Sequence, residues 1–372
     1  MANMLSYLEN YGDKTFSELP FTPVDNLILS QLAYCGFEEA KLPCPLGYLD
    51  GKVTYGVMAE DNEKLLRLAA SSRRFRETIP LLYVNEVDDG LIKQFSAITF
   101  LLTDGTAYAA FRGTDSTLVG WREDFMLAFE CPVPAQRRAV RYLDEVSRVL
   151  NCPIRAGGHS KGGNLAMYAA AFCSEETGKE LIGVYCNDAP GFDRSVLESE
   201  GFRRILPICS RYIPETSIIG MLLDNDAAYT VIDTTAIGFA QHNPYTWKTR
   251  GGCFVTKREL TAAGDFINDS VSGWLAHMDT QERRYLTDTL FDILEAGGTK
   301  TLRELRTEPA AILKMLAAVG RLEASDRQRM LSLVKAFLSS GAECGEKMVK
   351  GRLSDVGQGA EELLKRLLPG DK

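Results

Sequence analysis

One glycine-rich segment constrains the fold of this 372-residue chain more than any other: residues 158–162, Gly-His-Ser-Lys-Gly. A short apolar stretch, residues 152–156, precedes it, and an Ala-rich segment with strong helix propensity, residues 164–172, follows it. The predicted order is therefore strand, sharp turn and helix, which is the local architecture of a nucleophile elbow. We expect a fold of the α/β class with Ser160 at the apex of the turn.

The geometry of such a turn explains its residue types. The residue at the apex has a strained backbone, so Gly158 and Gly162, two positions to either side, must lack side chains that would collide. The turn lifts the Ser160 hydroxyl out of the sheet and places it at a helix N-terminus. There the Lys161 N–H and the helix dipole can stabilise a developing oxyanion. The segment matches neither a P-loop nor a dinucleotide-binding glycine pattern.

The flanking segments indicate a mainly parallel sheet. Apolar residues 97–102 and 107–111 flank Thr-Asp-Gly-Thr, and Asp-Gly between apolar runs is a strong hairpin signal. Residues 134–150 carry apolar side chains at helical spacing. Two more strands are predicted at residues 181–186 and 204–209. Because strands alternate with helices, we predict an α/β-hydrolase fold with helices on both faces of the sheet.

The C-terminal part of the chain has a different, helical character. We assign residues 1–255 to the α/β-hydrolase domain and residues 256–372 to a helical region that packs on it or caps it. Asp279 and Glu282 have the spacing of a capping box. One apolar face follows, formed by Leu286, Leu290, Ile293 and Leu294. These C-terminal helices are also a candidate surface for a protein partner.

Three histidines are present, which makes the search for a general base short. His159 lies inside the elbow beside Ser160, and we interpret it as structural. His277 lies in the late helical region and is interpreted as an ordinary helix residue. His242 lies in a polar, proline-containing loop after the last predicted strand, where this fold supplies its imidazole. We therefore predict that His242 is the base.

The acid of the triad has several candidates. Glu215 follows the second predicted strand after the elbow and is the first choice. Asp188 ends the first of these strands and is the alternative acid, and Asp224 and Asp226 remain open as well. Each of these residues also fits the role of a turn residue, because Asp commonly closes strands by bonding to its own backbone.

An upstream segment carries a resemblance to a known family. Residues 111–115, Phe-Arg-Gly-Thr-Asp, end the predicted hairpin, and residues 120–125, Gly-Trp-Arg-Glu-Asp-Phe, follow. Together with the later Gly-His-Ser-x-Gly-Gly, they resemble the class 3, fungal-type lipases. The resemblance implies that the Thr114 N–H is the second oxyanion donor and that Asp124 holds the Thr114 hydroxyl. It also implies that Arg112 is a structural tether.

The chain is more similar still to the bacterial Mbeg-like family of lipase-like proteins. This resemblance runs from residues 16–20, Phe-Ser-Glu-Leu-Pro, through residues 158–164 to residues 241–244, Gln-His-Asn-Pro, and so covers most of the chain. Two positions depart from the class 3 lipases. Lys161 replaces the usual apolar residue beside the nucleophile, and Glu215 stands where lipases carry Asp.

These observations predict a serine hydrolase that acts on a carboxylic ester, lipid-like or otherwise apolar, through a Ser-His-acid triad. No metal and no organic cofactor is expected. Two alternatives stay open. Another acyl hydrolase, such as a thioesterase or a peptidase, would use the same apparatus, and a hydrolase fold can also serve as a non-catalytic binding or scaffold protein.

The composition of the chain limits the cellular compartments and the kinds of partner that we expect. The net charge of −8 argues against nucleic acid, because phosphate binding needs a concentrated basic patch. The sequence shows neither a signal peptide nor a run of about 18 apolar residues. The number of cysteines is odd, and none are spaced as Cys-x-x-Cys. We therefore expect a cytoplasmic protein with reduced thiols and no transmembrane segment.

Overall fold

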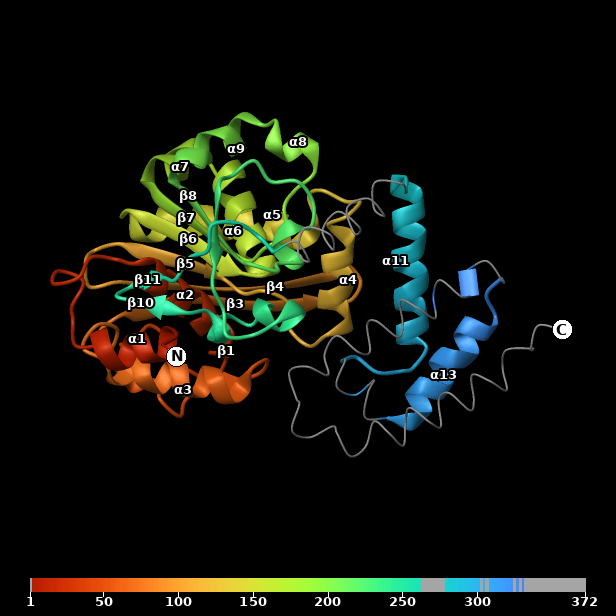
Figure 1. Ribbon diagram of the computed structural model, residues 1–372, viewed down its shortest axis with the longest axis horizontal. Helices are drawn as coiled ribbons and strands as arrows, with labels where there is room; N and C mark the ends of the chain where they lie inside the picture. The colour runs from red at the N-terminus through yellow and green to blue at the C-terminus, as the bar shows by residue number, and fades with distance from the viewer. Residues whose placement is uncertain are drawn as a thin grey trace. The chain divides into compact units, whose positions relative to one another are not determined.

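The computed structural model describes residues 2–261, 278–301, 304, 308–323, 326–327 and 330 (Figure 1). The chain divides into two compact units, Met1–Arg283 and Arg284–Lys372. The domain boundary expected at residue 255 stays a prediction, and His277 lies outside the described residues. Among the described helices, none has the length and apolar character needed to cross a membrane.

A seven-stranded sheet runs through the described part of the first unit, in the order β3-β4-β5-β6-β7-β8-β9 (Figure 1). Its strands are β3 Ile79–Asp88, β4 Lys93–Leu101, β5 Ala107–Phe111, β6 Ile154–His159, β7 Leu181–Asn187, β8 Cys209–Pro214 and β9 Tyr229–Ile232. β3, β4 and β5 pair antiparallel, whereas β5 to β9 run parallel to one another. The predicted α/β class with a mainly parallel sheet is therefore confirmed.

Helices pack on both faces of this sheet. One core includes residues of α5, α6 and α9, and the other includes residues of α1, α2 and α3. Successive side chains of β5 point to opposite faces of the sheet, so Ala109 and Phe111 belong to the first core and Tyr108 and Ala110 to the second. The α-helices described between residues 2 and 261 are α1 Met4–Tyr11, α2 Pro23–Leu32, α3 Ala59–Ser71, α4 Leu118–Met126, α5 Pro134–Leu150, α6 Lys161–Phe172, α7 Glu175–Glu180, α8 Arg194–Leu197 and α9 Glu200–Ile205.

Short strands and 3-10 helices also occur in the described part of the first unit. β1 Cys35–Gly36 pairs with β2 Thr54–Tyr55, and β10 Thr249–Arg250 pairs with β11 Cys253–Phe254. Short 3-10 helices occupy Leu46–Tyr48, Leu206–Ile208, Ile219–Met221, Gly238–His242 and Pro244–Thr246. The fourth of these carries the predicted base, so His242 sits in the loop region that follows the last strand of the large sheet.

The predicted hairpin and the long helix are confirmed. β4 and β5 pair from Ala97↔Phe111 to Leu101↔Ala107, and α5 spans the predicted residues 134–150. The strand predicted at residues 204–209 is wrong. Residues 200–205 form α9, whose N-cap Ser199 accepts a bond from the Phe202 N–H, and the strand begins only at residue 209.

The C-terminal helices that the structure describes are α11 Thr280–Glu295 and α13 Pro309–Gly320. The capping box expected before α11 is present. The Asp279 N–H donates to Glu282 Oε2 over 2.9 Å, and the Glu282 N–H donates to Asp279 Oδ1 over 2.8 Å. The predicted apolar face of α11 is buried.

Candidate active site

The turn between β6 and α6 has the strained geometry expected of a nucleophile elbow. Ser160 has φ 58° and ψ −135°, a backbone region that residues with side chains rarely adopt. The Ser160 N–H donates to the Asn187 carbonyl over 3.0 Å, which ties the turn to the end of β7. A Cβ at Gly162 would overlap the Phe111 carbonyl oxygen, and a Cβ at Gly158 would overlap the Gly162 backbone. The half-buried Ser160 side chain is thus held at the carboxyl edge of the sheet.

The imidazole of His242 is bonded to a buried carboxylate. Its Nδ1 lies 2.6 Å from Asp188 Oδ2, and Asp188 follows directly after β7. The other carboxylate oxygen of Asp188 accepts bonds from the Ser217 hydroxyl and, over 3.1 Å, from the Gly220 N–H. The Asp188 side chain is 1% exposed, whereas the His242 side chain is 21% exposed. The carboxylate therefore orients an imidazole that solvent and ligands can reach.

His159 places His242 beside the elbow. The two rings are in contact, tilted by 34° with centroids 4.5 Å apart, and His159 Nε2 lies 2.8 Å from the His242 carbonyl oxygen. Because a carbonyl only accepts, His159 Nε2 carries the proton of this bond. Burial, together with the nearby charge of His242, lowers the pKa of His159 to about 3. His159 therefore stays neutral and braces the loop, in keeping with the structural role predicted for it.

The carboxylate of Glu215, the first choice for the acid, pairs with a lysine. Its Oε2 lies 3.5 Å from Lys257 Nζ. The alternative, Asp188, is the carboxylate at the imidazole. Asp224 is exposed and lies 3.6 Å from Arg194, and Asp226 is exposed as well. The sequence placed acidic residues at the ends of both β7 and β8, but local patterns contain no signal that decides between them.

The segment after β5 runs past the elbow. A Cβ at Gly113 would lie 3.2 Å from the Ser160 Cβ, so the backbone leading to Thr114 is close to the serine. The Thr114 hydroxyl donates to Asp124 Oδ2, as the class 3 resemblance implied. Arg112 Nη2 reaches Asn85 Oδ1 over 3.1 Å, which fits a tether. Burial raises the pKa of Asp124 to about 6.

The Lys161 side chain has a buried, charged environment that the sequence pattern did not predict. The sequence pattern predicted a role only for its backbone N–H. Its ammonium is buried and lies 3.1 Å from Glu123 Oε2 and 3.5 Å from Asp124 Oδ1. Burial by itself lowers the pKa of Lys161, but the charges of Glu123 and Asp124 outweigh it and the pKa is raised. Lys161 is therefore a buried cation. The one available signal was a lysine where lipases carry an apolar residue.

A buried hydrogen-bond network on the face of the sheet that α2 covers supports the elbow. Asn187 Nδ2 donates to the Gly158 carbonyl over 3.0 Å and to Asn26 Oδ1 over 3.1 Å. Tyr108 donates to the same Asn26 oxygen over 2.7 Å. Because every bond in this set is buried, the network fixes α2 against β6 and β7 at the point where the turn begins.

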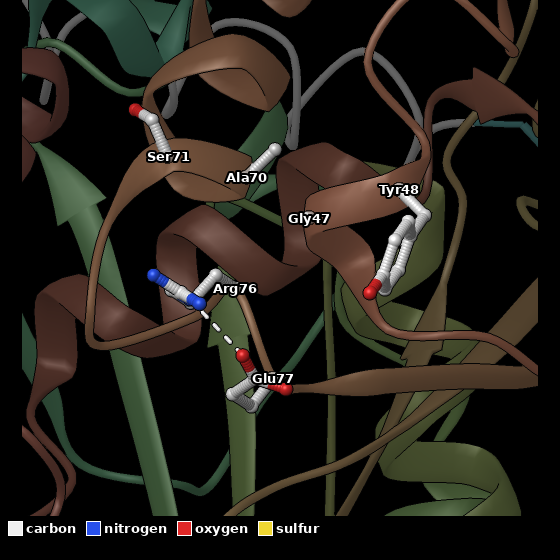
Figure 2. A pocket seen from close by; sticks show the side chains of 6 residues that line it. All are labelled: Gly47, Tyr48, Ala70, Ser71, Arg76 and Glu77. Atoms are coloured by element: carbon white, nitrogen blue, oxygen red, sulfur yellow. Dashed lines mark hydrogen bonds and ion pairs between the residues drawn. The ribbon is translucent and has the colours of Figure 1, made fainter.

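A separate hollow lies near α3 and contains none of the candidate residues. Its walls are Gly47, Tyr48, Ala70, Ser71, Arg76 and Glu77 (Figure 2). Arg76 and Glu77 form an exposed ion pair of 3.0 Å, and Tyr48 is 66% exposed. The hollow contains the hydroxyl of Ser71 but no histidine among its lining residues to act as its base, so we do not regard it as an active site.

Comparisons with known proteins identify the family to which the chain belongs. A search of curated proteins gives no match. Among solved structures, M37 lipase is 14% identical, with a TM-score of 0.37, over 62% of this chain and 84% of that chain. Rhizomucor miehei lipase in its propeptide complex is 15% identical, with a TM-score of 0.33, over 56% and 68% of the two chains. The Mbeg1-like family profile matches residues 69–292, and the chain therefore belongs to the Mbeg1-like family.

Proposed function

We propose that this protein is a serine hydrolase of the α/β-hydrolase type that cleaves a carboxylic ester. Ser160 is the nucleophile, His242 the general base and Asp188 the acid that orients it. The observation that carries the proposal is the 2.6 Å bond from His242 Nδ1 to a buried carboxylate, beside a serine in a strained turn. A strained serine and an imidazole oriented in this way form the arrangement that nucleophilic acyl transfer needs.

The proposed reaction passes through an acyl-enzyme on Ser160. Nε2 of His242 takes the Ser160 proton while Oγ forms a bond to the acyl carbon, and the carbonyl electron pair moves onto oxygen. The Thr114 and Lys161 N–H groups hold that oxyanion. The C–O bond to the alcohol then breaks, and the alcohol leaves with the proton from His242. Water attacks the acyl-enzyme by the same route and releases the acid.

Asp188 supports this chemistry without being protonated itself. Because its carboxylate accepts a bond from His242 Nδ1–H, the lone pair of the imidazole is on Nε2, where a base must present it. When the imidazolium forms, the negative charge of the carboxylate stabilises it. The bonds from Ser217 and Gly220 keep the carboxylate in place through both states.

Labelling with a fluorophosphonate probe tests the proposal. We expect covalent labelling of the wild type, loss of labelling in Ser160→Ala, and unchanged labelling in Ser195→Ala, which removes an exposed serine outside the site. Turnover of p-nitrophenyl esters of increasing acyl length, with a matching thioester, then defines the substrate. A folded protein that neither labels nor turns over any of these substrates would favour the scaffold alternative.

A further inference from the structure

A buried ionic cluster lies beside the elbow and outside the proposed triad. The Lys161 side chain is 1% exposed and that of Glu123 is 0% exposed. Besides Glu123, Lys161 Nζ donates to the Gln94 carbonyl over 3.2 Å and to Gln94 Oε1 over 2.9 Å. The three N–H donors of the ammonium thus meet three buried acceptors. Desolvating the ammonium is costly, and these three acceptors offset part of that cost.

The cluster is anchored to the rigid part of the fold. Glu123 Oε2 also accepts the Gln94 N–H over 3.0 Å, which ties the cluster to β4. Glu123 Oε1 accepts the Ala135 N–H over 2.8 Å, at the start of α5, where a negative charge is favoured by the helix dipole. The ammonium of Lys161 is therefore held against a sheet strand and a long helix.

Asp124 connects this cluster to the segment that carries Thr114. Its Oδ2 accepts the bond from the Thr114 hydroxyl, and its Oδ1 lies 3.5 Å from Lys161 Nζ. One carboxylate thus joins the side chains of the two residues whose N–H groups are the proposed oxyanion donors. Burial raises the pKa of Asp124 to about 6, although the positive charge of Lys161 partly offsets this rise. Without the ammonium, that pKa would rise further.

We propose that Lys161 is a positioning residue, whose ammonium acts through Asp124 to hold the Thr114 segment at the distance from the elbow at which both N–H groups meet one oxyanion. The inference rests on the proposed function for its catalytic meaning. The bridge itself, Lys161–Asp124–Thr114, is a property of the fold. A displacement of about 1 Å at a reacting centre costs about a hundredfold in rate.

Three variants test the bridge by kinetics. Lys161→Met keeps the N–H donor but removes the ammonium. Asp124→Asn keeps an acceptor for the Thr114 hydroxyl and leaves the Lys161–Glu123 pair balanced, so it avoids an uncompensated buried charge. We expect each to lower kcat by about tenfold to a hundredfold with KM within about twofold, since an oxyanion forms only after binding. The double variant should be no slower than the worse single one, because both cut the same bridge.

The exposed Lys179→Met serves as the matched control, because Lys179 pairs with the exposed Glu175 on α7, away from the elbow. It should leave kcat unchanged. If Asp124→Asn is as fast as the wild type, or if the two single effects add in full, Lys161 merely neutralises Glu123 and the proposal is overturned.

Amide hydrogen exchange supplies a readout that does not need activity. In Asp124→Asn, the amides of residues 113–117 should exchange at least about tenfold faster than in the wild type, while those of residues 158–163 keep their protection. Unchanged exchange at residues 113–117 would refute the bridge even if the wild type hydrolyses no ester. An inactive, unlabelled wild type with the expected exchange would instead refute the proposed function and leave the bridge standing.

Discussion

Replacing Asp188 by asparagine isolates the acid of the proposed triad from the rest of the fold. The amide of the new side chain would retain one carbonyl oxygen to accept the bonds from the Ser217 hydroxyl and the Gly220 N–H, and only the bond to His242 changes. Residue 188 has φ 47°, a left-handed conformation that asparagine tolerates as well as aspartate. The substitution therefore perturbs one hydrogen bond and one charge.

The magnitude follows from what that bond does. An amide NH₂ facing His242 Nδ1 makes Nδ1 the acceptor and puts the proton on Nε2, so the imidazole can no longer take a proton from Ser160. A triad with the wrong tautomer loses about 10⁴ in kcat, which corresponds to about 5.5 kcal/mol of transition-state stabilisation. The free energy of unfolding should fall by only about 1.5–3 kcal/mol, the net contribution of a hydrogen bond to a charged group.

Glu215→Gln is the matched control, because it makes the same chemical change at the end of the neighbouring strand. Glu215 lies 3.5 Å from a partly exposed Lys257, and such pairs contribute about 0–1 kcal/mol. We expect kcat/KM within about twofold of the wild type. The assay is p-nitrophenyl ester turnover at about pH 7.5, with urea unfolding of each variant. An Asp188→Asn enzyme that keeps more than about a tenth of the wild-type rate, or a Glu215→Gln enzyme that loses about a hundredfold, would refute the assignment.

Three further predictions concern stability. His159 has a pKa of about 3 in the folded chain against about 6.5 in the unfolded chain, so the unfolded state binds an extra proton as the pH falls through 6.5. The free energy of unfolding should therefore fall by about 1.6 kcal/mol between pH 6.5 and 5, and urea titrations of His159→Asn should lack this contribution. Gly162→Ala should lower the free energy of unfolding by at least about 2 kcal/mol, because its Cβ would overlap the Phe111 carbonyl, and a denaturation midpoint equal to the wild type's would contradict the tight turn. Arg74→Met should lower the free energy of unfolding by about 3–5 kcal/mol, because it leaves the fully buried Asp25 carboxylate, 2.5 Å from the guanidinium, without its cation. Thermal melting measures this loss, and a melting temperature lowered by less than about 2 °C would argue against it.

Much of the candidate site could be predicted from local sequence because its parts are local. A serine between glycines, after an apolar strand and before an Ala-rich helix, has few ways to fold, and the elbow is strained as expected. The hairpin formed by β4 and β5 follows from Asp-Gly between two apolar runs. The proposal of His242 followed from elimination among three histidines, because the loops after the last strand are where this architecture places an imidazole.

The remaining features depend on contacts between distant segments. The proposed acid is Asp188 and not Glu215, because the loop that carries His242 approaches the end of β7, whereas the turn after β8 directs Glu215 toward Lys257. Residues 200–205 form a helix because Ser199 caps it.

The sequence by itself determined the class of fold and the candidates for nucleophile and base, since strand-turn-helix patterning and residue chemistry are written in consecutive residues. Only the tertiary structure decided which carboxylate meets the imidazole and which partners surround the Lys161 ammonium. Lys161 and Glu123 lie 38 positions apart in the chain, and His242 and Asp188 lie 54 positions apart. Such pairs meet only when separate strands and helices pack together, and no local pattern encodes that meeting.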